Sequence, residues 1–208
     1  MSTNRSKEKY DSLARYYDQR WERYLEATHK VAIDLLEPKG NDIILDASGG
    51  TGLLIERIIS TIGDEGKFYL CDISKEMLDI AENRLIKFRN VYLSQQDVHH
   101  LDFDDNYFSK VLSASSFHYY TEPYEVLCNF HRILKHEGAL IIVDWCSNSL
   151  HFKLFNILLR LLSKYHVNIY TSNELKSLIE TANFVVEKII NFKHGLWNLV
   201  GIRAIKQR

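Results

Sequence analysis

The sequence predicts an α/β fold: a seven-stranded, mostly parallel sheet with helices on both faces and a C-terminal antiparallel hairpin. Three observations lead to this prediction. From residue 43 onward, short apolar, β-branched runs alternate with segments of helical periodicity. The first run is followed by a glycine-rich loop, and the last two are separated only by residues 193–196.

The order of the elements predicts the parallel part of the sheet. Helices near 53–60, 75–87 and 124–134 separate five strand-like runs. A strand, a crossover helix and a second strand place the two strands parallel, with the helices covering the sheet. The expected strands are 43–46, 68–71, 91–93, 110–114 and 139–145.

The segment before the first strand is expected to be helical. Between Lys9 and Leu36, apolar and aromatic residues recur at helical intervals, with charged residues between them. Pro38 and Gly40 end this region. We interpret it as two helices.

The segment after the fifth strand departs from the alternating pattern. An apolar helix is expected at 152–165, and a capping box from Thr171 to Glu174 opens a helix that ends near residue 181. Runs at 185–191 and 197–205 follow. Their short connection predicts an antiparallel hairpin at one edge of the sheet.

Composition excludes several function classes. The 26 Lys and Arg are balanced by 27 Asp and Glu and are scattered, so no nucleic-acid partner is expected. The spacing of Cys71, Cys128 and Cys146 suggests reduced residues near the core, without a disulfide or metal. No signal peptide or membrane-spanning run is seen, which predicts a cytoplasmic protein and leaves peripheral membrane contact open.

The loop after the first strand, Asp46 to Gly52, holds three glycines in four residues. Glycine lets backbone approach a ligand closely, and in parallel sheets ligands bind beyond the carboxyl ends of the strands. The alternative is a tight turn with no ligand. About twenty residues later, Asp72 ends the second strand, where a carboxylate can accept hydrogen bonds from ribose hydroxyls, or alternatively cap the next helix.

A dinucleotide site would use similar residues. Its GxGxxG pattern needs a sixth-position glycine beneath the pyrophosphate, and that position is Ile55 here. The branched side chain disfavours a dinucleotide.

Five segments together resemble the class I S-adenosylmethionine-dependent methyltransferases, whose sheet is Rossmann-like. The resemblance is greatest to small ubiquinone/menaquinone biosynthesis methyltransferases and bacterial phospholipid N-methyltransferases, whose opening helix carries a pattern similar to Tyr10 to Asp18. The segments are Asp46 to Gly52, Asp72, Gln96-Asp97, Phe117 to Tyr119 and Arg132 to Lys135.

The resemblance implies one methyltransferase domain over 1–208. Its expected parts are an N-terminal helical cap (1–40), a cofactor-binding core (41–145), a lid segment (146–170) and a C-terminal helix with the hairpin (171–208). The cofactor would be S-adenosylmethionine, and S-adenosylhomocysteine the product.

The resemblance also implies roles for individual residues. Asp72 would hold the ribose, Asp97 the adenine amino group, and backbone near Ala114 and Ser115 the methionine ammonium. The glycine loop would pass beneath the methionine and ribose. The full set of predicted cofactor contacts is Tyr17, Asp46, Ser48, Gly49, Gly50, Thr51, Gly52, Asp72, Ile73, Met77, Asp97, Val98, Ala114 and Ser115.

The sequence departs from the family pattern at two places. Ser48 replaces the first motif glycine, which could narrow the pocket, and residues 135–138 replace the usual Lys-Pro-Gly-Gly turn. A relative that has lost cofactor binding is one alternative.

Methyl transfer needs orientation more than a catalytic side chain, because the sulfonium already activates the methyl group. A base helps when the acceptor must lose a proton. His118, on the expected rim of the crevice, is the first candidate, followed by Tyr119 and Tyr17; packing is the alternative role for His118. The neighbours His99 and His100 would point to opposite sides, so no metal is assigned.

We expect a small-molecule acceptor, apolar or amphiphilic, bound between the N-terminal helices and 146–170. The 152–165 helix either packs as a lid or lies on an anionic membrane, where a phospholipid headgroup would be methylated. Similarly, Tyr17, Trp21 and Tyr24 either pack together or form a cage for an amine. Further alternatives are a non-methylating cofactor-binding protein and, less favoured, nucleic-acid or protein methylation. The oligomeric state is left open.

Overall fold

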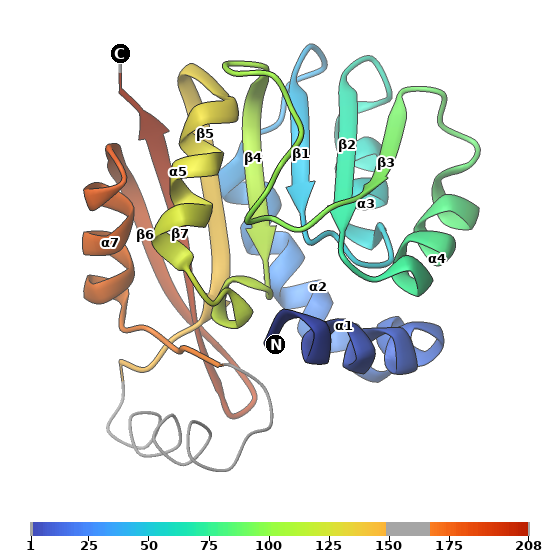
Figure 1. Cartoon of the computed structure of the whole chain (residues 1–208), viewed down its shortest axis with the longest axis horizontal. Coiled ribbons are helices and arrows are strands. Elements are labelled where there is room, and N and C mark those ends of the chain that lie inside the picture. Colours follow the sequence, from blue (N-terminus) through green and yellow to red (C-terminus); the bar gives the residue numbers. More distant parts are fainter. Residues whose placement is uncertain (1, 149–166, 208) are drawn as a thin grey trace.

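The computed structural model describes residues 2–148 and 167–207, with side chains described from residue 7 onward. Its sheet has seven strands in the order β3-β2-β1-β4-β5-β7-β6 (Figure 1). The strands are β1 (Ile43–Ala47), β2 (Lys67–Asp72), β3 (Val91–Gln95), β4 (Phe108–Ala114), β5 (Leu134–Trp145), β6 (Phe184–His194) and β7 (Trp197–Lys206).

The predicted sheet topology is confirmed. Strands β1 to β5 pair in parallel, whereas β7 pairs antiparallel with both β5 and β6. The order reverses between β1 and β4, so the loops that follow these two strands diverge at their carboxyl ends. A ligand crevice is expected at such a reversal.

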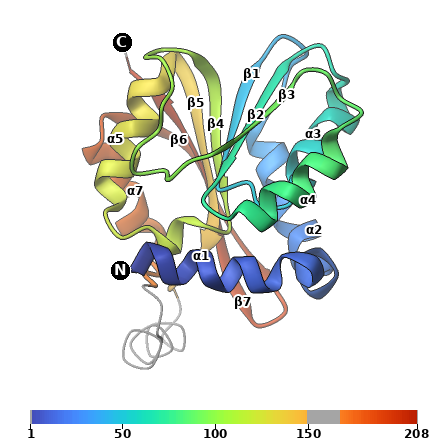
Figure 2. The ribbon, with the colours of Figure 1, turned by 45° about the vertical axis from the view of Figure 1, so that its right-hand side comes forward.

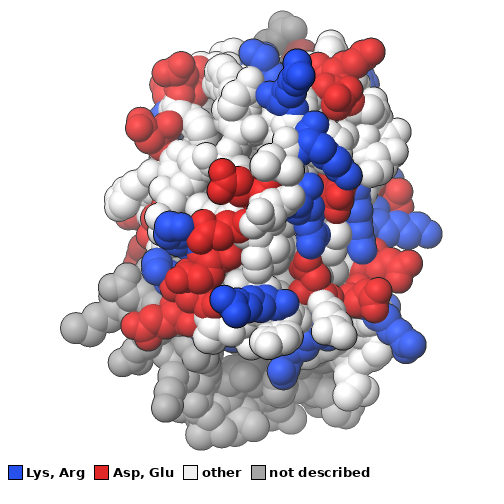
Figure 3. Space-filling view, turned by 90° about the vertical axis from the view of Figure 1, so that its right-hand side faces the viewer, with Lys and Arg blue, Asp and Glu red and all other residues white. Residues whose placement is uncertain are grey.

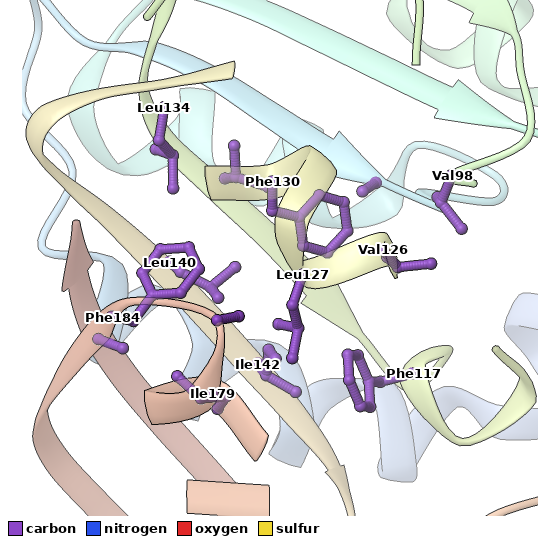
Figure 4. Close-up of a cluster of buried hydrophobic side chains, with 14 of the residues drawn as sticks. Val98, Phe117, Val126, Leu127, Phe130, Leu134, Leu140, Ile142, Ile179 and Phe184 are labelled. Atoms are coloured by element: carbon purple, nitrogen blue, oxygen red, sulfur yellow. The ribbon is translucent and has the colours of Figure 1, made fainter. Parts of the chain in front are cut away.

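Helices cover both faces of the sheet. On one face lie α2 (Tyr17–Leu36), α3 (Leu53–Ile62) and α4 (Lys75–Leu85); on the other lie α5 (Pro123–Ile133) and α7 (Ser172–Thr181). Figure 4 shows α5 and α7 packing Phe130 and Ile179 against the sheet. The capping box predicted at Thr171 is present at the start of α7.

The N-terminal region is two helices, as predicted, but the first begins earlier. Helix α1 (Ser2–Leu13) and α2 are joined by the 3-10 turn η1 (Ala14–Tyr16). The start of α1 is polar and has no apolar periodicity, so sequence alone did not reveal it. Figure 2 shows α1 crossing the carboxyl ends of the strands.

Three expectations need correction or fall outside the structure. Cys71 and Cys146 are buried, but Cys128 is exposed on α5 rather than near the core. Strand β5 begins at Leu134, before the predicted residue 139. Its pairing with β4 is irregular between Phe108, which pairs with Leu134, and Lys110, which pairs with Ala139. The expected helix at 152–165, and with it most of the predicted lid, lies outside the described residues.

Charged side chains are mixed on the face that Figure 3 shows, with Lys and Arg beside Asp and Glu. This agrees with the scattered charges of the sequence. Within residues 2–148 and 167–207, no helix combines the length and the apolar character that crossing a bilayer requires.

Candidate functional site

The glycine loop lies at the carboxyl end of β1 and forms the floor of a cleft. Gly50 has a left-handed backbone (φ 55°), and so has Ser48 (φ 62°), where glycine would be less strained. A Cβ on Gly49 would lie 2.6 Å from Leu70 Cγ and 2.8 Å from Asp46 Cγ. Only bare backbone therefore fits at Gly49.

Asp72, at the end of β2, holds this loop from the side. Its Oδ2 accepts a hydrogen bond from the Gly50 amide (2.9 Å), and its Oδ1 accepts one from the Ser74 amide (2.8 Å). Ser74 itself caps α4, since its side chain accepts from the Met77 amide. The alternative in which Asp72 is the helix cap is therefore wrong. Each carboxylate oxygen retains a second lone pair for a ligand.

Asp46 supplies a second carboxylate to the cleft. Its Oδ2 is buried and has no hydrogen-bond partner among the described residues. Burial, with the nearby Asp72 charge, raises the pKa of Asp46 to about 8. Burial also raises the pKa of Asp72 to about 6, although the amide hydrogen bonds act to lower it. Two desolvated carboxyls at this position favour a cationic ligand group.

The far end of the cleft is apolar on one side and polar on the other. Ile73, Met77 and Val98 line it together with Asp97. Asp97 Oδ1 accepts from the His99 backbone amide (3.0 Å) and contacts His99 Nδ1. Burial acts to raise the pKa of Asp97, but these hydrogen bonds outweigh it and lower the pKa. This arrangement fits a flat ring that carries an amino group at its edge.

The N-terminal helices form the roof. Tyr10 and Tyr17 line the cleft from above, with ring centroids 5.9 Å apart. Lys9 Nζ donates to the Tyr119 hydroxyl (2.8 Å) on the β4 side, and Asp11 accepts from the Ser74 hydroxyl on the β2 side. Helix α1 is thus bonded to both walls.

Asp18, at the start of α2, connects the roof to the floor. Its Oδ1 accepts from the Thr51 hydroxyl (2.7 Å), and its Oδ2 pairs with Arg84 of α4. The sequence pattern from Tyr10 to Asp18 contained this residue, but its role was not assigned. The contact explains why an acidic residue follows the tyrosine pair.

Two predicted site residues do not line the cleft. Gly52 has a left-handed backbone (φ 75°), and a Cβ there would lie 2.7 Å from Leu85 Cδ1. Gly52 therefore permits close packing of α3 against α4 rather than contact with a ligand. His118 was expected on the rim but is 2% exposed, with Nδ1 2.6 Å from Asp144 Oδ1.

The other predicted residues are brought together around the cleft. Those lining it are Tyr17, Asp46, Ser48, Gly49, Gly50, Thr51, Asp72, Ile73, Met77, Asp97, Val98, Ala114, Ser115 and Tyr119. Sequence reasoning missed a group contributed mainly by helix faces and by the turn after β4: Leu25, His29, Leu53, Leu54, Ser116 and Tyr120. Their helical spacing resembles ordinary core packing, so the sequence carries no separate signal for them.

Comparisons with known proteins agree with this geometry. The sequence profile of a family described as a methyltransferase domain matches residues 44–138. The ubiquinone/menaquinone biosynthesis C-methyltransferase UbiE of Coxiella burnetii is 30% identical over 155 residues, which are 71% of this chain and 62% of that protein. The chain thus spans less than two thirds of this relative's length.

Solved structures share the fold. A protein of Haloferax volcanii in complex with the Trm112 methyltransferase activator has a TM-score of 0.83 and 18% identity, with 96% of this chain and 98% of that chain covered. Geranyl diphosphate C-methyltransferase of Streptomyces coelicolor has a TM-score of 0.71 and 16% identity, covering 87% and 77%.

These findings define the class of protein. The chain carries a match to a methyltransferase domain over residues 44–138, and it is similar to S-adenosylmethionine-dependent methyltransferases in sequence and fold, in agreement with the resemblance of its motifs.

The residues of the cleft fit the cofactor of this family. The unpartnered oxygen of Asp46 suits a cationic amino acid moiety, and the free lone pairs of Asp72 suit a pair of hydroxyls. Ser48, which replaces the first motif glycine, lines the cleft, and its hydroxyl lies 3.1 Å from the hydroxyl of Tyr120, another lining residue.

Proposed function

We propose that this protein binds S-adenosylmethionine and transfers its methyl group to a small apolar or amphiphilic acceptor of quinone, lipid or natural-product type. The observation that carries the proposal is the buried, unpartnered oxygen of Asp46 beside Asp72. A desolvated carboxylate lacking a donor is costly unless a cationic ligand completes it.

In this proposal the protein mainly binds and orients. Asp46 and Asp72 hold the cofactor, which supplies an activated methyl group, while Tyr10, Tyr17 and Tyr119 exclude water above it. In-line orientation of an acceptor can contribute about 7 to 11 kcal/mol in the best cases, so methyl transfer requires no metal or covalent intermediate.

The nature of the acceptor is supported by the relatives. The UbiE relative is a quinone biosynthesis C-methyltransferase, and the Streptomyces neighbour methylates a prenyl diphosphate. Both names point to carbon acceptors with apolar character. We therefore rank a prenylated hydroquinone above an amine or a phospholipid headgroup.

Two measurements test the proposal. Titration calorimetry is expected to detect S-adenosylmethionine binding with micromolar affinity. S-adenosylhomocysteine release is then measured with a prenylated 1,4-naphthalenediol, simple phenols, primary amines and phosphatidylethanolamine vesicles, and a mass gain of one methyl is expected on the naphthalenediol. Cofactor binding without release from any acceptor would instead support a non-methylating protein.

A further inference from the structure

His118 is held more firmly than a packing histidine requires. Its Nδ1 lies 2.6 Å from Asp144 Oδ1, and its backbone amide donates to Asp144 Oδ2 (2.9 Å). Its ring stacks on Trp145 at 4.1 Å and 13°, and also lies 4.1 Å from the Tyr119 ring. Both orientation and position of the imidazole are therefore fixed.

This arrangement determines where the imidazole proton lies. An ionised carboxylate can only accept hydrogen bonds, so the nitrogen facing Asp144 carries the proton. In the neutral ring the lone pair is then on Nε2. Nε2 is buried and has no hydrogen-bond partner among the described residues. A buried acceptor without a donor is unfavourable, which suggests that a ligand supplies the donor.

His118 does not itself line the cleft, but it follows β4 in the turn Phe117–Tyr119, next to a residue that does. Tyr119, against which His118 packs, lines the cleft. Trp145 Nε1 donates to the Tyr24 hydroxyl (3.0 Å), which in turn lies 3.0 Å from the hydroxyl of the cleft residue Ser115. Both rings that hold His118 are thus connected to the cleft.

The two tyrosines predicted as alternative bases are less suited. Burial raises the pKa of Tyr17, so its hydroxyl keeps its own proton near neutral pH. The Tyr119 hydroxyl accepts a hydrogen bond from the Lys9 ammonium. Neither offers an uncommitted proton acceptor comparable to Nε2.

We propose that His118 and Asp144 form a base dyad for an acceptor with an acidic O–H or C–H group, such as a phenol, hydroquinone or enol. Asp144 is the positioning residue that keeps the lone pair on Nε2. The inference rests on the proposed methyl transfer and deepens it, because an acceptor that must lose a proton benefits from a base, whereas a neutral amine attacks with its own lone pair.

The proposed step conserves atoms and charge. The attacking oxygen or carbon of the acceptor bonds to the methyl carbon, and the methyl–sulfur bond breaks with its electron pair left on sulfur. The acceptor proton passes to Nε2, and the resulting imidazolium, stabilised by Asp144, later releases it to water. The positive charge thus moves from sulfur to the imidazole and then to solvent.

The first test reads the tautomer directly. Nitrogen-15 NMR of histidine-labelled protein is expected to show His118 with a protonated Nδ1 and an unprotonated Nε2 at pH 7.5. Adding 1,4-naphthalenediol to protein saturated with S-adenosylhomocysteine is expected to shift the Nε2 resonance. A protonated Nε2, or an Nε2 resonance that the diol leaves unchanged, overturns the dyad even if no acceptor is turned over.

The second test separates catalysis from structure with three variants. H118Q is expected to lower kcat for the naphthalenediol by about 100-fold or more, and D144N by about 10-fold or more, with cofactor Kd unchanged within threefold. H131Q, a half-buried histidine outside the cleft, is the matched control and should keep wild-type kcat. An H118Q variant that folds, binds cofactor and retains kcat within threefold contradicts the dyad while leaving the proposed methyl transfer intact.

Discussion

The two ends of the sheet differ in whether their buried polar groups have hydrogen-bond partners. At the amino end, Lys110 Nζ donates to the carbonyls of Leu36 and Glu37 and pairs with Asp42 at 3.1 Å. Lys206 Nζ similarly donates to Asn106 Oδ1 and the Leu134 carbonyl. These cations complete the ends of α2 and α5, so their hydrogen-bond partners are supplied by the fold itself.

At the carboxyl end, buried polar atoms are left without partners. Asp46 Oδ2 and His29 Nδ1 line the cleft, and His118, which carries the unpartnered Nε2, is next to a lining residue. Among the described residues, Asn90 Oδ1 and Arg84 Nη1 are also buried and unpartnered, and neither residue lines the cleft. The fold is therefore stabilised at the amino end of the sheet, whereas the carboxyl end retains unsatisfied hydrogen-bonding capacity that a ligand can use.

The largest expected effect comes from removing a buried cation at the amino end of the sheet. Lys110→Met removes the buried ammonium and leaves Asp42 and two carbonyls without it, so the free energy of unfolding should fall by about 3 to 5 kcal/mol. Chemical denaturation measures this. Cofactor affinity of the folded fraction should remain within twofold. A large loss of affinity without a loss of stability would contradict the division between the two ends.

The second largest effect is expected from a substitution in the cleft, at the carboxyl end of the sheet. Asp72→Asn removes the charge that is proposed to hold the ribose, and cofactor affinity should fall by at least about 100-fold, since hydrogen bonds to a charged group contribute about 1.5 to 3 kcal/mol each. The variant should also lose about 1 to 3 kcal/mol of stability, because an amide side chain has one acceptor oxygen and cannot accept from both the Gly50 and the Ser74 amides. Calorimetry and thermal melting are needed together. A loss of stability with cofactor affinity unchanged would assign Asp72 a structural role alone.

A third effect is the pH dependence of the two carboxyls. The pKa values of Asp46 and Asp72 lie above the ordinary value, so the native state holds more protons than the unfolded chain between about pH 4 and pH 8. Without cofactor, stability should therefore fall as pH rises through this window. Cofactor affinity should rise instead, by up to about tenfold per pH unit for each carboxyl that must ionise.

Calorimetry in two buffers of different ionisation enthalpy would count the protons released on binding. Asp46→Asn is the control, because it should abolish the part of the pH dependence centred near pH 8. Affinity that is flat from pH 6 to pH 8 would contradict this account of the site.

The smallest expected effect concerns backbone strain. Ser48 has a left-handed backbone, and Ser48→Gly relieves it while losing the contact with the Tyr120 hydroxyl, which keeps Ser113 and Ser116 as partners. The net change should be a stabilisation of roughly 0.5 to 1 kcal/mol. Thermal melting measures it, and a destabilised variant would show that the hydroxyl contact outweighs the strain.

Sequence patterns were informative where a residue's role depends on local backbone. The glycines of the loop, the carboxylates that end β1 and β2, and the capping box at Thr171 all act within a few residues of their position in the chain. The topology followed from element order for the same reason. Residues such as His29 and Tyr120 could not be assigned, because they reach the cleft only through packing.

Sequence alone therefore determined the sheet, the hairpin and the cofactor side of the cleft, since glycine conformation and strand-end position are local properties. Only the tertiary structure decided the roles of Gly52 and His118. One packs helix against helix, and the other meets Asp144, 26 residues away, because β4 and β5 are adjacent in the sheet. Contacts between distant segments depend on how elements pack, and a single sequence does not display that.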